Sequence, residues 1–154
     1  MPPPPPISLD GLPPAFEMAG RISVTQEGRG DIVRLRWTHR PETDVYSLVS
    51  PVGTELARIE RGAQGYVAAR AGQTPVSVLE FATLTQNLLG VALDERALIA
   101  WLHARTGPAQ SAGWSVSLEE SQEVSGVEIA RRLTAVRDAV TVKLVVDSYR
   151  TLAP

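Results

Sequence analysis

Cysteine is absent from this chain of 154 residues, which excludes disulfide bonds, thiolate nucleophiles and zinc sites built from cysteine. Aromatic residues are scarce, at 5% of the sequence, so the core must consist mainly of Val, Leu, Ile and Ala. Positive charge is not in excess, because 15 Lys and Arg face 17 Asp and Glu, and no nucleic-acid partner is expected. No apolar run approaches the roughly 20 residues that span a bilayer as a helix. The length and composition of the chain fit a single domain with an aliphatic core.

Proline is concentrated at the start of the chain. Residues 1–15 hold seven of the twelve prolines, and proline favours the extended polyproline II conformation. We therefore interpret residues 1–15 as an extended tether and residues 16–154 as the folded domain. The five prolines after Met1 cannot form the basic and apolar regions of a signal peptide, so the protein is either cytoplasmic or has lost a leader.

Residues 21–70 alternate between apolar and polar side chains, as half-buried strands do. Val33, Leu35 and Trp37 share one face of such a strand, and turn residues separate the apolar runs at hairpin spacing. The pattern predicts an antiparallel meander of five strands.

The period of the pattern then changes to that of helices. One helix is expected over residues 75–89, ended by Gly90, and a second over residues 94–105, capped by Asp94. Three more strands are expected from residue 114 onward. Five strands, two helices and three strands predict a mainly β (α+β) fold, in which both helices cover one side of a strongly curved antiparallel sheet.

Motifs of catalysis are nearly absent from the sequence. It has no Gly-rich phosphate loop, no G-x-S-x-G elbow and no H-E-x-x-H helix. His39 lies at a predicted turn and His103 near a helix end, and neither has a neighbour at metal-ligand spacing. We therefore predict no enzyme activity, no metal and no other cofactor.

The predicted sheet and the first predicted helix present apolar faces to each other. These faces hold Val24, Leu35, Trp37, Tyr46 and Leu48 on the sheet and Val78, Phe81 and Leu88 on the helix. The two faces form either an ordinary dry core or a cavity for an apolar ligand, and periodicity does not separate these interpretations. We predict a ligand cavity, which a fluorescent acyl probe would detect.

The turn Pro51-Val52-Gly53 places an aliphatic side chain between the two strongest turn-forming residues. Hairpin tips are usually polar, so an apolar tip indicates contact with a partner or a membrane. The alternative is that Val52 folds back onto the sheet.

Several short motifs follow one another along the chain: Phe16-x-x-x-Gly20-Arg21-Ile22-x-Val24, Trp37, Tyr46-x-Leu48-x-x-Pro51-Val52-Gly53, Leu88-Leu89-Gly90, Leu98-x-x-Trp101-Leu102 and Trp114-x-Val116. In this order they resemble the LolB family of outer-membrane lipoprotein receptors, over roughly residues 16–151. The resemblance implies an unclosed antiparallel β-barrel with a two-helix lid and an apolar cavity. It also implies a function without chemistry, in which acylated lipoproteins are taken from the periplasmic carrier LolA and placed in outer-membrane lipid.

The family also implies roles for particular positions. Its Pro-Leu-Gly loop protrudes, and Val52 matches the leucine that is needed for insertion, with a shorter aliphatic side chain. Family members carry a signal and a lipidated cysteine, so the resemblance implies that both were removed here. The protein would then be a monomer anchored at the periplasmic face of the outer membrane.

Two features depart from the family pattern. Pro13 and Pro14 exclude a long helix before the first strand, and the short segment 105–114 leaves less room for a barrel flank. A reduced lid and a more open cavity are therefore expected. The alternative functions are a soluble carrier like LolA, an inert envelope scaffold of the same fold, and a lipid hydrolase, for which no nucleophile or base is found.

Overall fold

The computed structural model describes residues 7–153 and contains nine strands, two α-helices and one short 3-10 helix. The elements, in chain order, are β1 (Phe16–Gln26), β2 (Arg29–His39), β3 (Asp44–Val49), β4 (Glu55–Gly62), β5 (Gly65–Ala69), β6 (Val76–Val78), α1 (Phe81–Leu89), α2 (Glu95–Leu102), the 3-10 helix η1 (Pro108–Gln110), β7 (Ser115–Val124), β8 (Val127–Arg137) and β9 (Val140–Thr151).

All nine strands form one antiparallel sheet with the order β6-β5-β4-β3-β2-β1-β9-β8-β7. Two meanders, β1–β6 and β7–β9, are joined where β1 pairs with β9. Gly20 lies at a bulge in this seam, and a Cβ at Gly20 would lie 2.2 Å from the carbonyl oxygen of Val145. Only glycine permits this close approach of the two strands.

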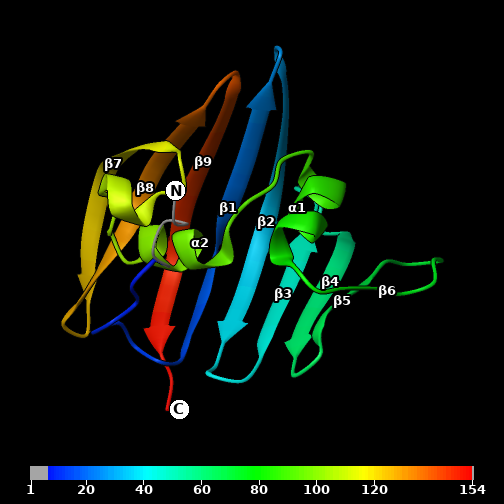
Figure 1. Ribbon diagram of the computed structural model, residues 1–154, viewed down its shortest axis with the longest axis horizontal. Coiled ribbons are helices and arrows are strands. Elements are labelled where there is room, and N and C mark those ends of the chain that lie inside the picture. Colours follow the sequence, from blue (N-terminus) through cyan, green and yellow to red (C-terminus); the bar gives the residue numbers. More distant parts are fainter. Residues whose placement is uncertain (1–6, 154) are drawn as a thin grey trace, which may run out of the picture.

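The sheet is curved and open, because β6 and β7 are its two edges and do not pair with each other. Helices α1 and α2 lie together over one face of it (Figure 1). Strand residues that face the helices are buried and their neighbours are exposed, as in β2, where Val33, Leu35 and Trp37 alternate with exposed Arg34 and Arg36. This confirms the predicted curved antiparallel sheet with a two-helix layer.

The predicted helix over 75–89 is wrong before residue 81, where α1 begins. Val76–Val78 is strand β6, in which Val76 and Val78 pair with Ala68 and Tyr66 of β5. β-branched residues pack well on a pleated surface, and the edge of β5 supplies the hydrogen-bond partners. The second predicted helix is capped by Asp94 as expected, but it ends at Leu102 rather than near residue 105.

The prediction of an extended tether over 1–15 is wrong for residues 7–15, the part of it that the structure describes. Residues 1–6 lie outside the described part of the chain, whereas residues 7–15 pack against the domain. Ile7 and Ala15 are buried, and both Nε and Nη2 of Arg96 donate to the Ile7 carbonyl oxygen, at 3.0 and 2.6 Å. Apolar residues among the prolines therefore fix this segment to α2 and to the sheet. Within residues 7–153, no helix is long and apolar enough to cross a membrane.

Candidate functional site: interior, mouth and hairpin tip

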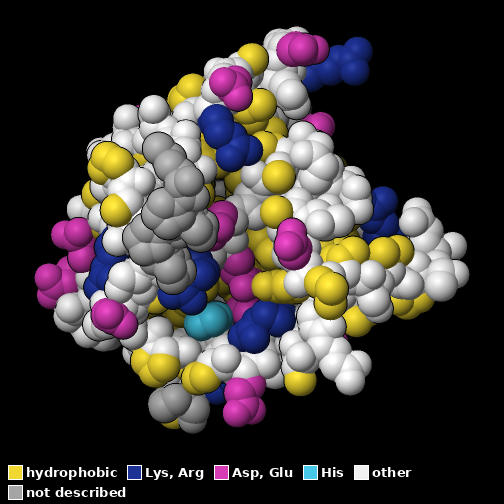
Figure 2. Space-filling model, viewed as in Figure 1, with side chains coloured by type: hydrophobic (Ala, Val, Ile, Leu, Met, Phe, Trp, Pro, Cys, Tyr) yellow, Lys and Arg dark blue, Asp and Glu magenta, His cyan; other side chains and the backbone are white. Residues whose placement is uncertain are grey.

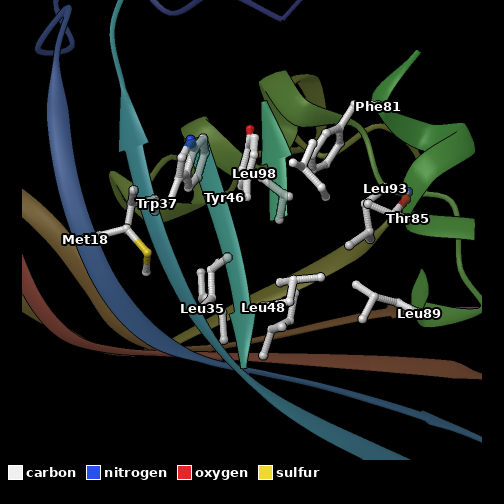
Figure 3. Close-up of a pocket in the computed structure, with 14 residues that line it drawn as sticks. Met18, Leu35, Trp37, Tyr46, Leu48, Phe81, Thr85, Leu89, Leu93 and Leu98 are labelled. Atoms are coloured by element: carbon white, nitrogen blue, oxygen red, sulfur yellow. Dashed lines mark hydrogen bonds between the residues drawn. The ribbon is translucent and has the colours of Figure 1, made fainter. Parts of the chain in front are cut away.

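An apolar cavity lies between the sheet and the helices (Figure 3). Its volume is about 40 Å³, and its walls include Leu35, Trp37, Tyr46 and Leu48 from the sheet and Phe81 from α1. Ligand pockets for small molecules usually enclose ~300–1,000 Å³, so the interior is nearly filled by its own side chains in this conformation.

Five of the eight residues predicted to line the cavity do so, namely Leu35, Trp37, Tyr46, Leu48 and Phe81. The other three lie elsewhere: Val24 is buried near the end of β1, Val78 belongs to β6, and Leu88 lies in a separate surface pocket with Val76 and Ala68. The misplaced start of α1 accounts for Val78, which is on a strand and not on the helix. That any of these residues binds a ligand remains a prediction.

A wider groove opens between the two helices on the same side of the sheet. It measures about 740 Å³, and Phe81 and Leu93 line both this groove and the apolar cavity. Figure 2 shows a hollow over the middle of this face, where acidic, basic and histidine side chains gather. We call this groove the mouth, because it shares Phe81 and Leu93 with the apolar cavity.

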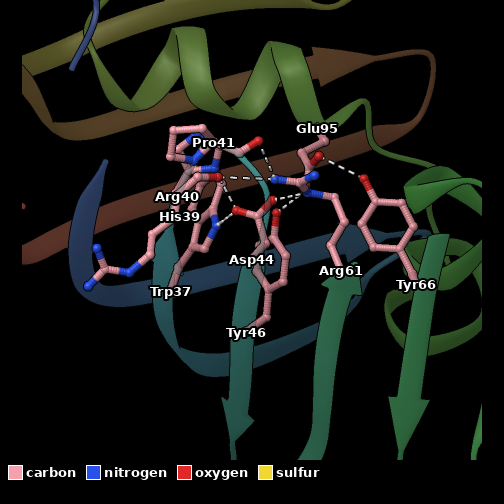
Figure 4. A network of polar contacts seen from close by, with 9 residues as sticks. All are labelled: Trp37, His39, Arg40, Pro41, Asp44, Tyr46, Arg61, Tyr66 and Glu95. Carbon is pink, nitrogen blue, oxygen red and sulfur yellow. Dashed lines mark hydrogen bonds and ion pairs between the residues drawn. The ribbon is translucent and has the colours of Figure 1, made fainter. Parts of the chain in front are cut away.

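Glu95, the first residue of α2, lies in the wall of the mouth. Its carboxylate accepts hydrogen bonds from the hydroxyls of Tyr46 on β3 and Tyr66 on β5, the latter at 2.7 Å (Figure 4). Burial raises the pKa of Glu95, as does the nearby charge of Asp44, while the two tyrosine hydrogen bonds oppose this rise. Burial, followed by the charge of Glu95, also raises the pKa of Tyr46. These contacts hold α2 against the sheet.

Asp44, at the start of β3, is the centre of a second set of polar contacts. Its side chain is fully buried and accepts hydrogen bonds from Trp37 Nε1 at 2.8 Å and from the guanidinium of Arg61, and lies 2.6 Å from His39 Nδ1. A buried carboxylate needs such partners, since an unpaired charge in the interior is very costly. Among residues 7–153 no cluster of His, Asp and Glu has the arrangement of a metal site.

The Pro51-Val52-Gly53 turn lies between β3 and β4, away from these polar contacts. Val52 is 89% exposed, so it does not fold back onto the sheet. The Gly53 amide donates to the Ser50 carbonyl at 2.9 Å, and the Ser50 amide donates to the Thr54 carbonyl at 2.8 Å. Gly53 has φ 93°, a conformation that favours glycine. The turn is thus held by its backbone and presents an aliphatic side chain to the surroundings.

Comparison with known proteins identifies this arrangement. The family model for outer membrane lipoprotein LolB matches residues 14–149. The chain belongs to the LolB family. Outer-membrane lipoprotein LolB from Thiobacillus denitrificans is 27% identical over 166 aligned positions, covering 96% of this chain and 88% of that protein. The LolB proteins of Chromobacterium violaceum and Cupriavidus necator are 24% and 29% identical, covering 88% and 85% of this chain and 80% and 78% of those proteins.

Solved structures support the LolB fold. A LolA superfamily protein from Nitrosomonas europaea superimposes with a TM-score of 0.53 at 8% identity, covering 93% of this chain and 88% of that one. A DUF1329 family protein from Desulfovibrio piger gives 0.56, also at 8% identity, covering 92% and 87%. The resemblance to LolB and the unclosed barrel with helices that it implied are therefore confirmed.

Sequence reasoning missed several parts of this LolB site. Thr85 and Leu93 line the cavity, and the Thr85 hydroxyl accepts a hydrogen bond from the Leu93 amide at 2.8 Å, which places the loop between the helices. Glu95 and Asp44 were not identified either. One signal existed for Asp44: a buried indole N–H, here that of Trp37, usually has an acceptor nearby.

Proposed function

We propose that this protein takes acylated lipoproteins into its apolar interior from a periplasmic LolA carrier and inserts them into outer-membrane lipid through the Val52 turn. Membership of the LolB family makes it an outer-membrane lipoprotein receptor. The proposal concerns the steps and the residues that perform them. It requires no reaction and no cofactor, only transfer between apolar environments, and the protein acts as a monomer.

The cost of exposing acyl chains to water favours a transfer in which the protein shields them. Each buried CH₂ group is worth ~0.8 kcal/mol, so three long acyl chains in water would cost on the order of tens of kcal/mol. The closed interior, at about 40 Å³, is too small for such chains. We infer that α1 and α2 move away from the sheet when cargo enters, which requires Tyr46 and Tyr66 to release Glu95.

The exposed position of Val52 is the observation that carries the proposal. Burying a valine side chain in lipid is worth roughly 1.5 kcal/mol, which biases the turn toward a membrane without anchoring the protein. A gain this small allows the receptor to bind lipid and to dissociate again after delivery.

The test is a transfer assay with an acylated lipoprotein bound to the carrier, this protein and phospholipid vesicles. The lipoprotein is measured on the carrier, on the receptor and in the vesicles. Val52→Glu should still accept lipoprotein from the carrier but should deliver much less to the vesicles, because a carboxylate does not enter hydrocarbon. Val52→Leu should deliver at least as well as the parent.

Val67→Glu is the matched control, since Val67 is also an exposed valine, at 43%, but lies on β5 level with Val45, near the opposite end of β3 from the Val52 turn. It should leave both acceptance and delivery unchanged. Unchanged delivery by Val52→Glu would refute the insertion step and would favour a soluble carrier of LolA type.

The interior is tested separately with a fluorescent acyl probe. The parent should bind it, and Leu48→Glu, which places a charge in the cavity wall, should weaken binding. Thermal unfolding shows whether that variant is folded. An absence of binding by the folded parent would favour the scaffold alternative.

A further inference from the structure

Two arginines on the outer face of the sheet have no acidic partner. Arg34 and Arg36 lie on β2 and point away from the helices, because the residues between and beside them, Val33, Leu35 and Trp37, are buried. Within the described residues, neither arginine lies within ion-pair distance of a carboxylate. The charges of both side chains are therefore available to an external anion.

Arginines on neighbouring strands of the outer face do have acidic partners. Arg21 on β1 bonds Asp147 at 3.0 Å, and Arg58 on β4 bonds Glu60 at 3.0 Å. Arg21 is also directly opposite Arg34 in the register of β1 and β2. Like charges in opposite positions of a sheet are unfavourable, so this pair has to be balanced by negative charge. Asp147 supplies one such charge, which leaves the charges of Arg34 and Arg36 uncompensated.

A recess on the outer face brings these side chains together. It measures about 490 Å³ and is lined by Ala19, Gly20, Arg21, Arg34, Leu35, Arg36, Val49 and Asp147. Ala19 and Gly20 leave it open because their side chains are small or absent. Three guanidinium groups and one carboxylate therefore border a shallow apolar hollow. Guanidinium groups bind phosphate oxygens with two parallel hydrogen bonds, which makes such a border suited to phosphate.

The recess lies on the same side of the molecule as the Val52 turn. Arg34 is opposite Val49 in the register of β2 and β3, and Val52 follows three residues later, roughly 10 Å along the strand direction. Ile32 lies two residues beyond Arg34 toward the same end and is 56% exposed on the outer face. The headgroup zone of a bilayer leaflet is roughly 5–8 Å deep, so Arg34, about 10 Å behind an inserted tip, lies near phosphate depth when the sheet stands upright. Arg36 lies two residues further from the tip, roughly 7 Å, and reaches phosphate when the outer face leans toward the leaflet.

We propose that Arg34 and Arg36 bind the phosphate groups of membrane phospholipids while Ile32 enters the bilayer beside Val52. This rests on the proposed function in one respect, that the Val52 turn faces the membrane. Apolar and basic side chains are arranged in the order in which a leaflet presents hydrocarbon and phosphate. This order distinguishes a lipid surface from a soluble anion, which needs no exposed isoleucine.

The basic part is tested by vesicle co-sedimentation of the full chain. Vesicles of phosphatidylcholine are compared with and without phosphatidylglycerol, using the parent, Arg34→Gln/Arg36→Gln and Arg40→Gln/Arg150→Gln. The first double variant should bind anionic vesicles roughly 30-fold more weakly, as expected for two basic side chains at a lipid surface. The second removes the same charge from exposed positions at the opposite end of the sheet and should bind like the parent. Equal losses in both variants, or a loss in neither, would overturn the proposal.

The apolar part uses the lack of cysteine, which makes a single introduced cysteine specific for labelling. An environment-sensitive fluorophore on Ile32→Cys should shift to the blue when vesicles are added, and the same label on Val67→Cys, an exposed position on β5 near the opposite end of the sheet, should not. An unshifted Ile32 label would overturn the insertion of this residue. Binding of inorganic phosphate is measured in parallel. If the protein binds phosphate through Arg34 and Arg36 but does not bind vesicles, the ligand is a soluble anion and the membrane assignment is contradicted.

The failure of this proposal can be told apart from the failure of the proposed function. If Val52→Glu abolishes delivery while Arg34→Gln/Arg36→Gln binds vesicles like the parent, the insertion turn stands and the headgroup site falls. If the arginine variant loses vesicle binding while Val52→Glu delivers normally, the headgroup site stands and the insertion step falls.

Discussion

The two ends of β3 break the usual rule of burial in opposite directions. At its start, the carboxylate of Asp44 is fully buried, whereas three residues after its end the aliphatic Val52 is 89% exposed. Charged side chains are rarely buried completely, and an apolar side chain gains nothing by standing at a hairpin tip. The strand therefore carries two exceptions, at positions eight residues apart in the sequence.

The two residues differ in where their interaction partners lie. The Asp44 carboxylate has its polar partners inside the domain, in Trp37, His39 and Arg61, so it contributes to the fold. Val52 has no such partners within the domain, so any gain from its side chain must come from outside the molecule. An unusual residue with internal partners indicates stability, and one without them indicates function. Four variants test this distinction, beginning with the one expected to have the largest effect.

Asp44→Ala should lower the free energy of unfolding by about 3–5 kcal/mol, because it leaves the Arg61 charge and the Trp37 N–H without their acceptor. Urea unfolding at neutral pH measures this loss. Asp44→Asn keeps the shape and one acceptor and should lose less. A loss below about 1 kcal/mol for the alanine variant would show that these contacts do not stabilise the fold.

Tyr66→Phe should cost about 1.5–3 kcal/mol at pH 7, since it removes a hydrogen bond to the Glu95 carboxylate. Because the pKa of Glu95 is raised in the folded state, Glu95 keeps its proton there at pH values at which it has already lost it in the unfolded state. The free energy of unfolding therefore falls as pH rises from the ordinary glutamate pKa to the raised one. Loss of the tyrosine hydroxyl raises this pKa further and steepens the fall.

The Tyr66→Phe effect should therefore be smaller at pH 4 than at pH 7, which urea unfolding at both values would measure. In a Glu95→Gln background, which has no carboxylate at this position, the difference between the two pH values should disappear. A pH-independent cost in both backgrounds would contradict the role assigned to Glu95.

Gly53→Ala should cost about 1–2 kcal/mol, because an L-residue is strained at its positive φ of 93°. Gly62 offers a matched control: it has no positive φ and nothing within 4 Å of an added Cβ, so Gly62→Ala should be neutral or slightly stabilising. Thermal unfolding compares the two. Equal effects would show that the backbone conformation at Gly53 does not require glycine.

Val52→Glu should change stability least, by less than about 0.5 kcal/mol, as for other exposed positions. Thermal unfolding measures this change on the same preparation that is used for lipoprotein delivery. A large loss of stability would show that Val52 has internal partners and would remove the contrast between the two ends of β3.

Much of the sheet could be predicted because its information is local. The alternation of Leu35 and Trp37 with arginines determines which side of β2 is buried, and the structure confirms it. The exposed tip at Val52 was also predictable, since proline and glycine specify the turn.

The remaining features depend on contacts between distant segments. The 76–78 segment is a strand because β5 is beside it, and no local pattern reveals that partner. Glu95 is at the first turn of a helix, where a glutamate is ordinary, and its role arises only from Tyr46 and Tyr66 on the sheet. The cavity volume likewise depends on how the side chains pack, which periodicity does not specify.

The seam between β1 and β9 has a consequence for how the chain acquires its structure. Each meander is built from neighbours in sequence, but β1 pairs with β9 across nearly the whole length of the polypeptide. Pairings of such long range are slow to form, so β1 remains an unprotected edge until the last strand has been synthesised and docks. Once it does, the Leu152 amide donates to the Ala15 carbonyl at 3.0 Å, and the two ends of the domain lie side by side. A short peptide joining them, with new termini opened in the loop between β6 and α1, would turn this latest pairing into a local hairpin and should speed folding.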